Sequence, residues 1–104
     1  AVVELILDLV RACRPEAAEA PQIVHDHVAW GPGPRAAQAL MLTVRARALL
    51  DGRLAPTADD VMAMTRPVLS HRMALSFAAR AEGVDLENVI DQVTARAAGI
   101  EAAA

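Results

Sequence analysis

The sequence predicts an all-α protein, a small bundle of four to five helices. Three observations support this fold class. The 104 residues are rich in alanine and aliphatic side chains, and the aromatic ones are a single tryptophan and a single phenylalanine. Apolar residues recur at helical spacing in several segments. Prolines, glycines and N-capping residues separate these segments where helices are expected to begin and end.

Charge and cysteine content narrow the class of protein. The formal net charge of −3 argues against a nucleic-acid-binding module, which is normally basic. The single cysteine allows no disulfide framework and no thiolate metal cluster, so a reducing, cytoplasmic setting is expected. No apolar run approaches membrane-spanning length, and no membrane association is expected. Because Ala1 lies inside an apolar-periodic segment without an initiator methionine, we expect residues 1–104 to be one domain cut from a longer protein.

The first expected helix covers residues 2–13. Ile6, Leu9 and Cys13 share its apolar face, which predicts that Cys13 is a core residue and not a reactive thiol. The helix should end before Pro15, because the residue before a proline disfavours the helical conformation. Residues 15–21 carry two prolines and two glutamates and are expected to form an exposed, mobile linker.

Residues 22–30 leave two alternatives open, a short strand and a short helix; in this helical context the helix is preferred. The alternatives matter for His25 and His27. On a strand they would share a face and could chelate a metal, whereas on a helix they lie roughly 200° apart. With no third ligand nearby, no metal site is predicted.

The next helix is expected from Pro34 to Asp51. Its apolar residues spread around most of the circumference, which predicts a central helix buried on nearly all sides. Gly52 supplies the left-handed stop signal. A further helix should begin at Thr57, with Asp60 in capping-box position, and break at Pro67. Helix initiation thus explains the Asp59–Asp60 pair without a catalytic role.

Two more helices complete the prediction. Residues 73–82 are expected to be helical with Phe77 as their anchor, up to Gly83. Asp85 should cap the last helix, which carries one clean apolar stripe and ends at Gly99. Residues 101–104 are expected to fray.

The stretch Trp30-Gly31-Pro32-Gly33-Pro34-Arg35-Ala36 differs from the helical bulk. Pro34 can start a helix with Gly33 as its N-cap, which places Arg35 in the first turn. A cation there is unfavourable unless an anion lies opposite, and a helix N-terminus with a guanidinium suits phosphate. The residues leave two hypotheses open: Arg35 as a phosphate ligand, and Arg35 as a solvated surface arginine.

Motifs for complete catalytic machinery are missing from the sequence. It has no phosphate-binding loop of the Gly-x-x-x-x-Gly-Lys-Ser/Thr type and no nucleophile elbow. No nucleophile has a base beside it. We therefore predict no catalytic residue within this chain.

Four motifs in order resemble the C-terminal lid of MoxR-family AAA+ ATPases. The family reads Gly-Ala-(Ser/Gly)-Pro-Arg-Ala, then Ala-Leu-Leu-x-Gly-Arg, Val-Thr-x-x-Asp-Val and Val-Leu-x-His-Arg. Here the matching stretches are residues 30–36, 46–53, 55–61 and 68–72, and the resemblance covers about residues 23–97. Pro32 departs from the alanine usual in the family.

The resemblance implies a helical lid packed on a nucleotide-binding α/β core domain that this chain lacks. It implies that Arg35, in a motif loop with Gly31, Gly33 and Pro34, is the sensor arginine that contacts ATP. For the parent protein it implies ATP and Mg²⁺ as cofactors, ATP hydrolysis, a hexameric ring of subunits and chaperone-like remodelling, with a von Willebrand A domain protein as a partner. No cofactor is expected in the chain alone. His71 and Arg72 match the family pattern, and we expect them to be structural.

Two other hypotheses are weighed against this one. The first is a stand-alone helical protein-interaction module without a nucleotide role, which would use an apolar face to bind a partner. The second is a small metal-binding protein that uses His25 and His27, for which a complete ligand set is lacking.

Overall fold

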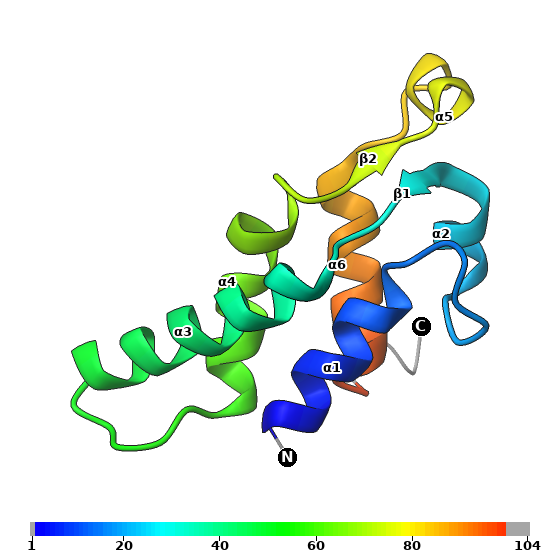
Figure 1. The fold of residues 1–104 in the computed structure, drawn as a ribbon. Helices are drawn as coiled ribbons and strands as arrows, with labels where there is room; N and C mark the ends of the chain where they lie inside the picture. The colour runs from blue at the N-terminus through cyan, green and yellow to red at the C-terminus, as the bar shows by residue number, and fades with distance from the viewer. Residues whose placement is uncertain (1, 100–104) are drawn as a thin grey trace.

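A computed structural model describes residues 2–99 of the chain as six helices and two short strands (Figure 1). In chain order, these elements are α1 (Val2–Ala12), α2 (Gln22–His27), β1 (Val28–Trp30), α3 (Pro34–Leu50), α4 (Ala58–Leu69), β2 (Ala74–Leu75), α5 (Phe77–Ala81) and α6 (Leu86–Ala97). The predicted helical bundle is confirmed. The expected fraying of residues 101–104 lies outside the described residues.

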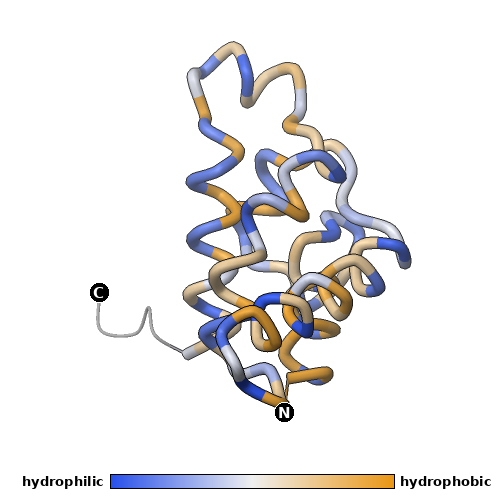
Figure 2. Tube along the Cα trace, turned by 90° about the vertical axis from the view of Figure 1, so that its left-hand side faces the viewer, coloured by the Kyte–Doolittle hydropathy of each residue, from blue (hydrophilic) through white to orange (hydrophobic). Residues whose placement is uncertain are grey.

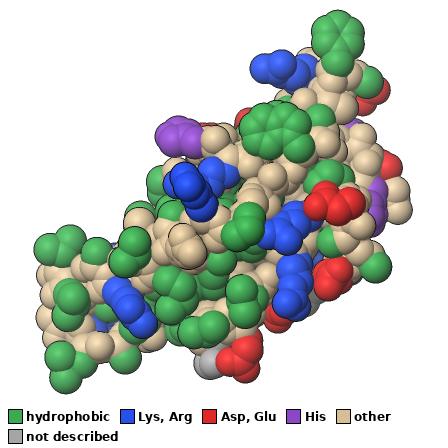
Figure 3. Space-filling view, viewed as in Figure 1, with side chains coloured by type: hydrophobic (Ala, Val, Ile, Leu, Met, Phe, Trp, Pro, Cys, Tyr) green, Lys and Arg blue, Asp and Glu red, His purple; other side chains and the backbone are tan. Residues whose placement is uncertain are grey.

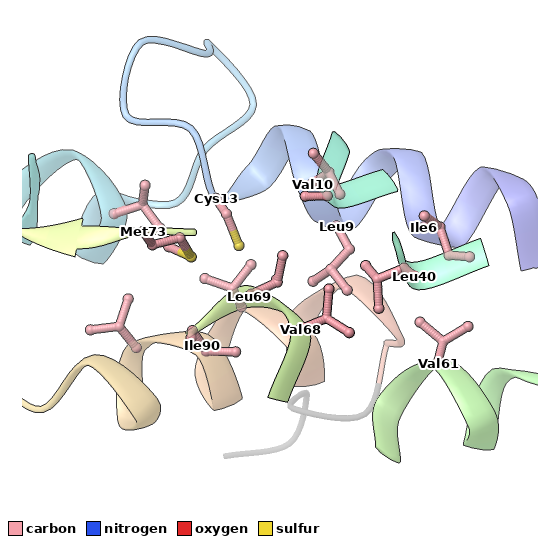
Figure 4. Close-up of a cluster of buried hydrophobic side chains, with 14 of the residues drawn as sticks. Ile6, Leu9, Val10, Cys13, Leu40, Val61, Val68, Leu69, Met73 and Ile90 are labelled. Atoms are coloured by element: carbon pink, nitrogen blue, oxygen red, sulfur yellow. The ribbon is translucent and has the colours of Figure 1, made fainter. Parts of the chain in front are cut away.

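Four helices form the bundle. Helix α3 packs on α4, α4 packs on α6, and α1 lies against α3, α4 and α6. Along these helices hydrophobic and hydrophilic stretches alternate, as amphipathic helices require (Figure 2). Side chains from α1, α3, α4 and α6 point toward one another in the centre, where Ile6, Leu9, Leu40, Leu69 and Ile90 are fully buried (Figure 4). Burial of this aliphatic cluster is the main force that holds the helices together.

Helix α4 confirms one predicted boundary and corrects another. It begins after Thr57 with the predicted capping box, in which the Thr57 N–H donates to Asp60 Oδ2 at 2.7 Å. It does not break at Pro67 but continues to Leu69. Pro67 lies in the last turn, so a single helical hydrogen bond is lost there, and the burial of Val68 and Leu69 in the core favours continuation.

The predicted helix over residues 73–82 is wrong in its first half. Residues 74–75 form β2, which pairs antiparallel with β1 in the register Val28↔Leu75 and Trp30↔Ala74. The paired strands β1 and β2 and the short helix α5 form an arm, and α5 lies at its tip (Figure 1). Phe77 is not an anchor: it is 87% exposed, and the buried Met73 takes the core position instead. Local periodicity could not show this, because the strand forms only by pairing with the distant segment 28–30.

The central helix is also less buried than predicted. One face of α3 enters the core through Ala36, Leu40, Val44 and Ala48. The opposite face leaves Leu42, Leu49 and Leu50 exposed, and Leu54 in the following loop is 97% exposed. Hydrophobic side chains gather over this end of the molecule (Figure 3). Apolar side chains do surround most of α3, but other described residues bury only one side of the helix.

The segment before α2 is partly anchored, contrary to the expected exposed linker. Ala20 and Pro21 are buried against the bundle. His25 Nδ1 lies 2.8 Å from the Pro15 carbonyl oxygen, and because a carbonyl only accepts, the ring nitrogen donates.

Nothing between residues 2 and 99 forms a helix with the length and hydropathy needed to span a bilayer.

Cys13 gives a direct test of the core. It is fully buried at the end of α1, and burial raises the pKa of its thiol to about 12. Because the thiolate is the reactive form, we expect the folded chain to resist a disulfide reagent at neutral pH and the urea-unfolded chain to react fully. Rapid labelling of a chain that circular dichroism shows to be folded would contradict this packing.

Candidate functional site

The loop between β1 and α3 is fixed by the end of α1. A Cβ atom placed on Gly31 would lie 2.5 Å from the Cys13 carbonyl oxygen and 2.9 Å from Arg14 Cα, so only glycine permits this approach of two backbones. The neighbouring Pro32 is buried, and its carbonyl accepts a hydrogen bond from Arg14 Nε at 2.9 Å. These two contacts set the direction in which the chain enters α3.

Helix α3 then starts as the sequence predicts. Gly33 is the N-cap in an extended conformation, with φ −91° and ψ −170°, and Pro34 is in the first turn. An extended N-cap is the conformation that a following proline favours. Arg35 is exposed, and its side chain has no hydrogen bond or ion pair within residues 2–99. No acidic residue lies in the first turn to offset its charge.

An open hollow adjoins this helix start. Its polar side chains are those of Arg35, Gln38 and Arg72, and Trp30, Gly31 and Pro34 form part of its wall. No aspartate or glutamate among residues 2–99 lines it. The hollow is therefore positively charged and has no carboxylate of its own, which is the electrostatic character of an anion-binding surface.

A second cluster of charged residues joins α3 to α4. Asp60 is fully buried and accepts a bidentate pair from Arg53, at 2.8 Å and 2.7 Å. Arg47 Nη1 donates to the same carboxylate at 2.6 Å, and so does the Thr57 N–H. The hydrogen bonds from Arg53, and then those from Thr57 and Arg47, hold the pKa of Asp60 well below its ordinary value. We call Arg47, Arg53 and Asp60 the Asp60 clamp.

The histidine pair does not assemble a metal site. Of the segment 22–30, residues up to His27 form helix α2, as preferred, and Val28–Trp30 form strand β1, where the preferred helix is wrong. Because His25 and His27 are both in the helix, they do not share a face. Over residues 2–99, no three side chains of the histidine, cysteine, aspartate and glutamate types come together to hold a metal ion.

Comparison with known proteins identifies the family. The sequence-family model described as "AAA lid domain" matches residues 20–98, which is most of the chain. The chain belongs to the AAA lid domain family. The lid is 32% identical over 93 residues to the chaperone MoxR1 of Mycobacterium tuberculosis, a match that covers 89% of this chain and 25% of MoxR1. The resemblance to the lids of MoxR-family AAA+ ATPases is thereby confirmed.

A solved structure shows the same fold. The lid matches the crystal structure of a "putative ATPase" from Cytophaga hutchinsonii with a TM-score of 0.83 and 26% sequence identity. The match covers 88% of this chain and 28% of that one. The lid thus spans about a quarter of the length of each of these two relatives.

Within the lid, the motif residues fall into two groups. Gly31, Gly33, Pro34 and Arg35 lie together at the start of α3, as predicted. The second and third motifs meet elsewhere, because Arg53 and Asp60 form the clamp between α3 and α4. Sequence reasoning attributed Asp60 to helix capping alone. The sequence signal for this ion pair was Arg53. It is a basic residue directly after Gly52, and the sequence analysis predicted no partner for it.

Sequence reasoning also missed the neighbour of Arg35 in the lid. Arg72 was expected to be structural, and part of it is: its Nη1 donates to the Val68 carbonyl oxygen at 2.9 Å. The same side chain also lines the hollow beside Arg35. His71, by contrast, is exposed, with its Nδ1 3.5 Å from Ser70 Oγ.

Proposed function

We propose that this lid senses ATP through Arg35 in a MoxR-type AAA+ ATPase. In this proposal residues 1–104 are one lid domain of a longer protein, and the α/β core domain of that protein binds ATP and Mg²⁺. The single observation that carries the proposal is the state of Arg35. It is an exposed guanidinium at a helix N-terminus, and within residues 2–99 it has no hydrogen-bond or ion-pair partner and no carboxylate lines its hollow.

Electrostatics explains how such an arginine would act. Phosphoryl transfer is catalysed mainly by positioning and by stabilising charge on the phosphate oxygens. A guanidinium at the γ-phosphate supplies that stabilisation and makes the lid position depend on the nucleotide present. The parent protein would accordingly hydrolyse ATP, and no catalytic step is assigned to the lid itself.

The exposed leucines support a docking role as part of the same proposal. Leu42, Leu49, Leu50 and Leu54 are all exposed along α3 and in the loop that follows it, and exposed apolar side chains that gather on one part of a surface mark interaction sites. In the assembled ATPase we propose that the core domain or a neighbouring subunit of a hexameric ring covers these leucines. Remodelling of other proteins, with a von Willebrand A domain protein as a partner, belongs to the same proposal.

The decisive experiment measures ATP turnover by the full-length protein. Replacing Arg35 by Ala should reduce turnover about tenfold or more, because one preorganised charge contact to the transferring phosphate is lost. Arg80→Ala is the control, since Arg80 is exposed on α5, outside the surface of exposed leucines, and also has no partner in residues 2–99. It should leave turnover unchanged.

Nucleotide binding and ring assembly must be measured in parallel, so that a fall in turnover can be assigned to Arg35 chemistry. Unchanged turnover in Arg35→Ala would refute the sensor role. The exposed apolar face of α3 would then favour the alternative function, a stand-alone helical protein-interaction module without a nucleotide role.

A further inference from the structure

The hollow beside Arg35 is lined by a second arginine from a distant part of the chain. Arg35 belongs to the first turn of α3, and Arg72 follows the end of α4. The β1–β2 pairing brings them together, because Trp30 lies opposite Ala74 and the two segments continue past each other from there. The convergence therefore follows from the architecture, and neither segment shows it alone.

Arg72 is held in this position by its surroundings. Leu69 and Met73, on either side of it, are buried in the core, and the Arg72 N–H donates to the Leu69 carbonyl at 2.9 Å. Its Nη1 is held by the Val68 carbonyl at 2.9 Å. The remaining N–H groups of the guanidinium have no partner within residues 2–99. Nη1 of Arg72 is thus held by the Val68 carbonyl, and the other N–H groups of the guanidinium can donate to a ligand.

The charge pattern indicates what the free part would bind. Two guanidinium groups border one hollow, Gln38 adds an amide donor, and none of the lining residues is acidic. Like charges without a counter-ion repel each other, and an anion bound between them removes this cost. Planar guanidinium donors match the oxygens of phosphate in particular.

We propose that Arg72 is a second phosphate-binding residue, which holds the terminal phosphate of a nucleoside triphosphate together with Arg35. The inference rests on the proposed nucleotide site and extends it, because it assigns Arg72 a role in binding as well as in structure. Contact with the terminal phosphate makes Arg72 a residue that distinguishes triphosphate from diphosphate.

The test is nucleotide binding by the full-length protein, measured as Kd for a non-hydrolysable ATP analogue and for ADP. Arg72→Gln is the main variant, because glutamine removes the charge and keeps a polar side chain with an N–H donor. It should weaken binding of the ATP analogue about tenfold and binding of ADP by less than about twofold. Arg80→Gln, at an exposed arginine on α5 without a partner in residues 2–99, should change neither.

A double-mutant cycle with Arg35→Ala adds an independent readout. If both arginines hold one phosphate group, the double variant should lose less affinity than the product of the two single losses. Arg72→Lys keeps the charge without the planar fork and should retain part of the affinity.

Each result decides between the two claims. Unchanged affinity for the ATP analogue in Arg72→Gln overturns the inference, and so does an equal loss for ATP analogue and ADP. A loss of affinity or turnover in Arg35→Ala with none in Arg72→Gln leaves the sensor proposal intact and refutes only the role of Arg72. No effect from either variant refutes both.

Discussion

Replacing Asp60 by Asn is expected to lower the melting temperature of the chain by about 10 °C, because two partly exposed arginines lose their buried counter-ion. The carboxylate is fully buried and accepts from Arg53, Arg47 and the Thr57 N–H. An amide of the same shape removes the negative charge and puts donors where acceptors are required. Thermal unfolding followed by circular dichroism measures the effect.

Asp59→Asn is the matched control for this substitution. Asp59 neighbours Asp60 in the first turn of α4, is exposed, and makes no ion pair within residues 2–99. Its loss removes only a favourable interaction with the helix dipole, so the melting temperature should fall by less than about 4 °C. Equal effects of the two substitutions would show that the Asp60 clamp does not stabilise the fold.

Asp60 should also make the stability of the chain depend on pH. Bonding to Arg53, Thr57 and Arg47 lowers the pKa of Asp60 from its ordinary value of 3.8. A carboxyl whose pKa is lowered by folding contributes its full stabilisation above the ordinary pKa and loses it as the pH falls toward the folded-state value. Stability of the wild-type chain should therefore decrease below about pH 4, and Asp60→Asn should show a shallower decrease there.

Replacing Gly31 by Ala is expected to destabilise the chain by about 3 kcal/mol, at the upper end of the range for overpacked sites. The added methyl would lie 2.5 Å from a backbone oxygen, that of Cys13, which cannot rotate away as a flexible side chain could. Cys13 is itself fully buried, and the Arg14–Pro32 hydrogen bond holds the loop against α1. Urea unfolding of the chain measures the difference.

Gly33→Ala separates this effect from a general sensitivity of the loop. No atom lies within 4 Å of the position that a Gly33 Cβ would occupy, and its φ of −91° suits any residue. Only the weaker capping by alanine remains, which costs less than about 1 kcal/mol. Similar losses at both positions would contradict the close backbone approach at Gly31.

The sequence was most informative where a helix carries its own boundary signals. Thr57 and Asp85 start α4 and α6 as predicted, and Gly52 adopts the positive φ of 77° that stops α3. These signals are local, so a single stretch of sequence contains them. The motif loop before Arg35 was predictable for the same reason, because consecutive glycines and prolines define it.

Non-local contacts account for the features that were missed. Phe77 was assigned to the core from its hydrophobicity, but the pairing of β1 with β2 carries it to the tip of an exposed arm. The Asp60 clamp and the position of Arg72 beside Arg35 also depend on how separate elements pack. Spacing within one helix cannot report such contacts, since they are set by tertiary structure.

Helix α3 connects the proposed phosphate site and the proposed docking surface as a rigid lever. Arg35 lies at its start and Leu50 at its end, roughly 25 Å apart for a helix of this length. No glycine or proline interrupts it between these residues, and the Asp60 clamp fixes its far end to α4. A tilt of the whole lid by about 5° about the arginine end therefore moves the leucine end by about 2 Å. The geometry converts a small change at one end into a displacement comparable to the helix shifts seen at subunit interfaces.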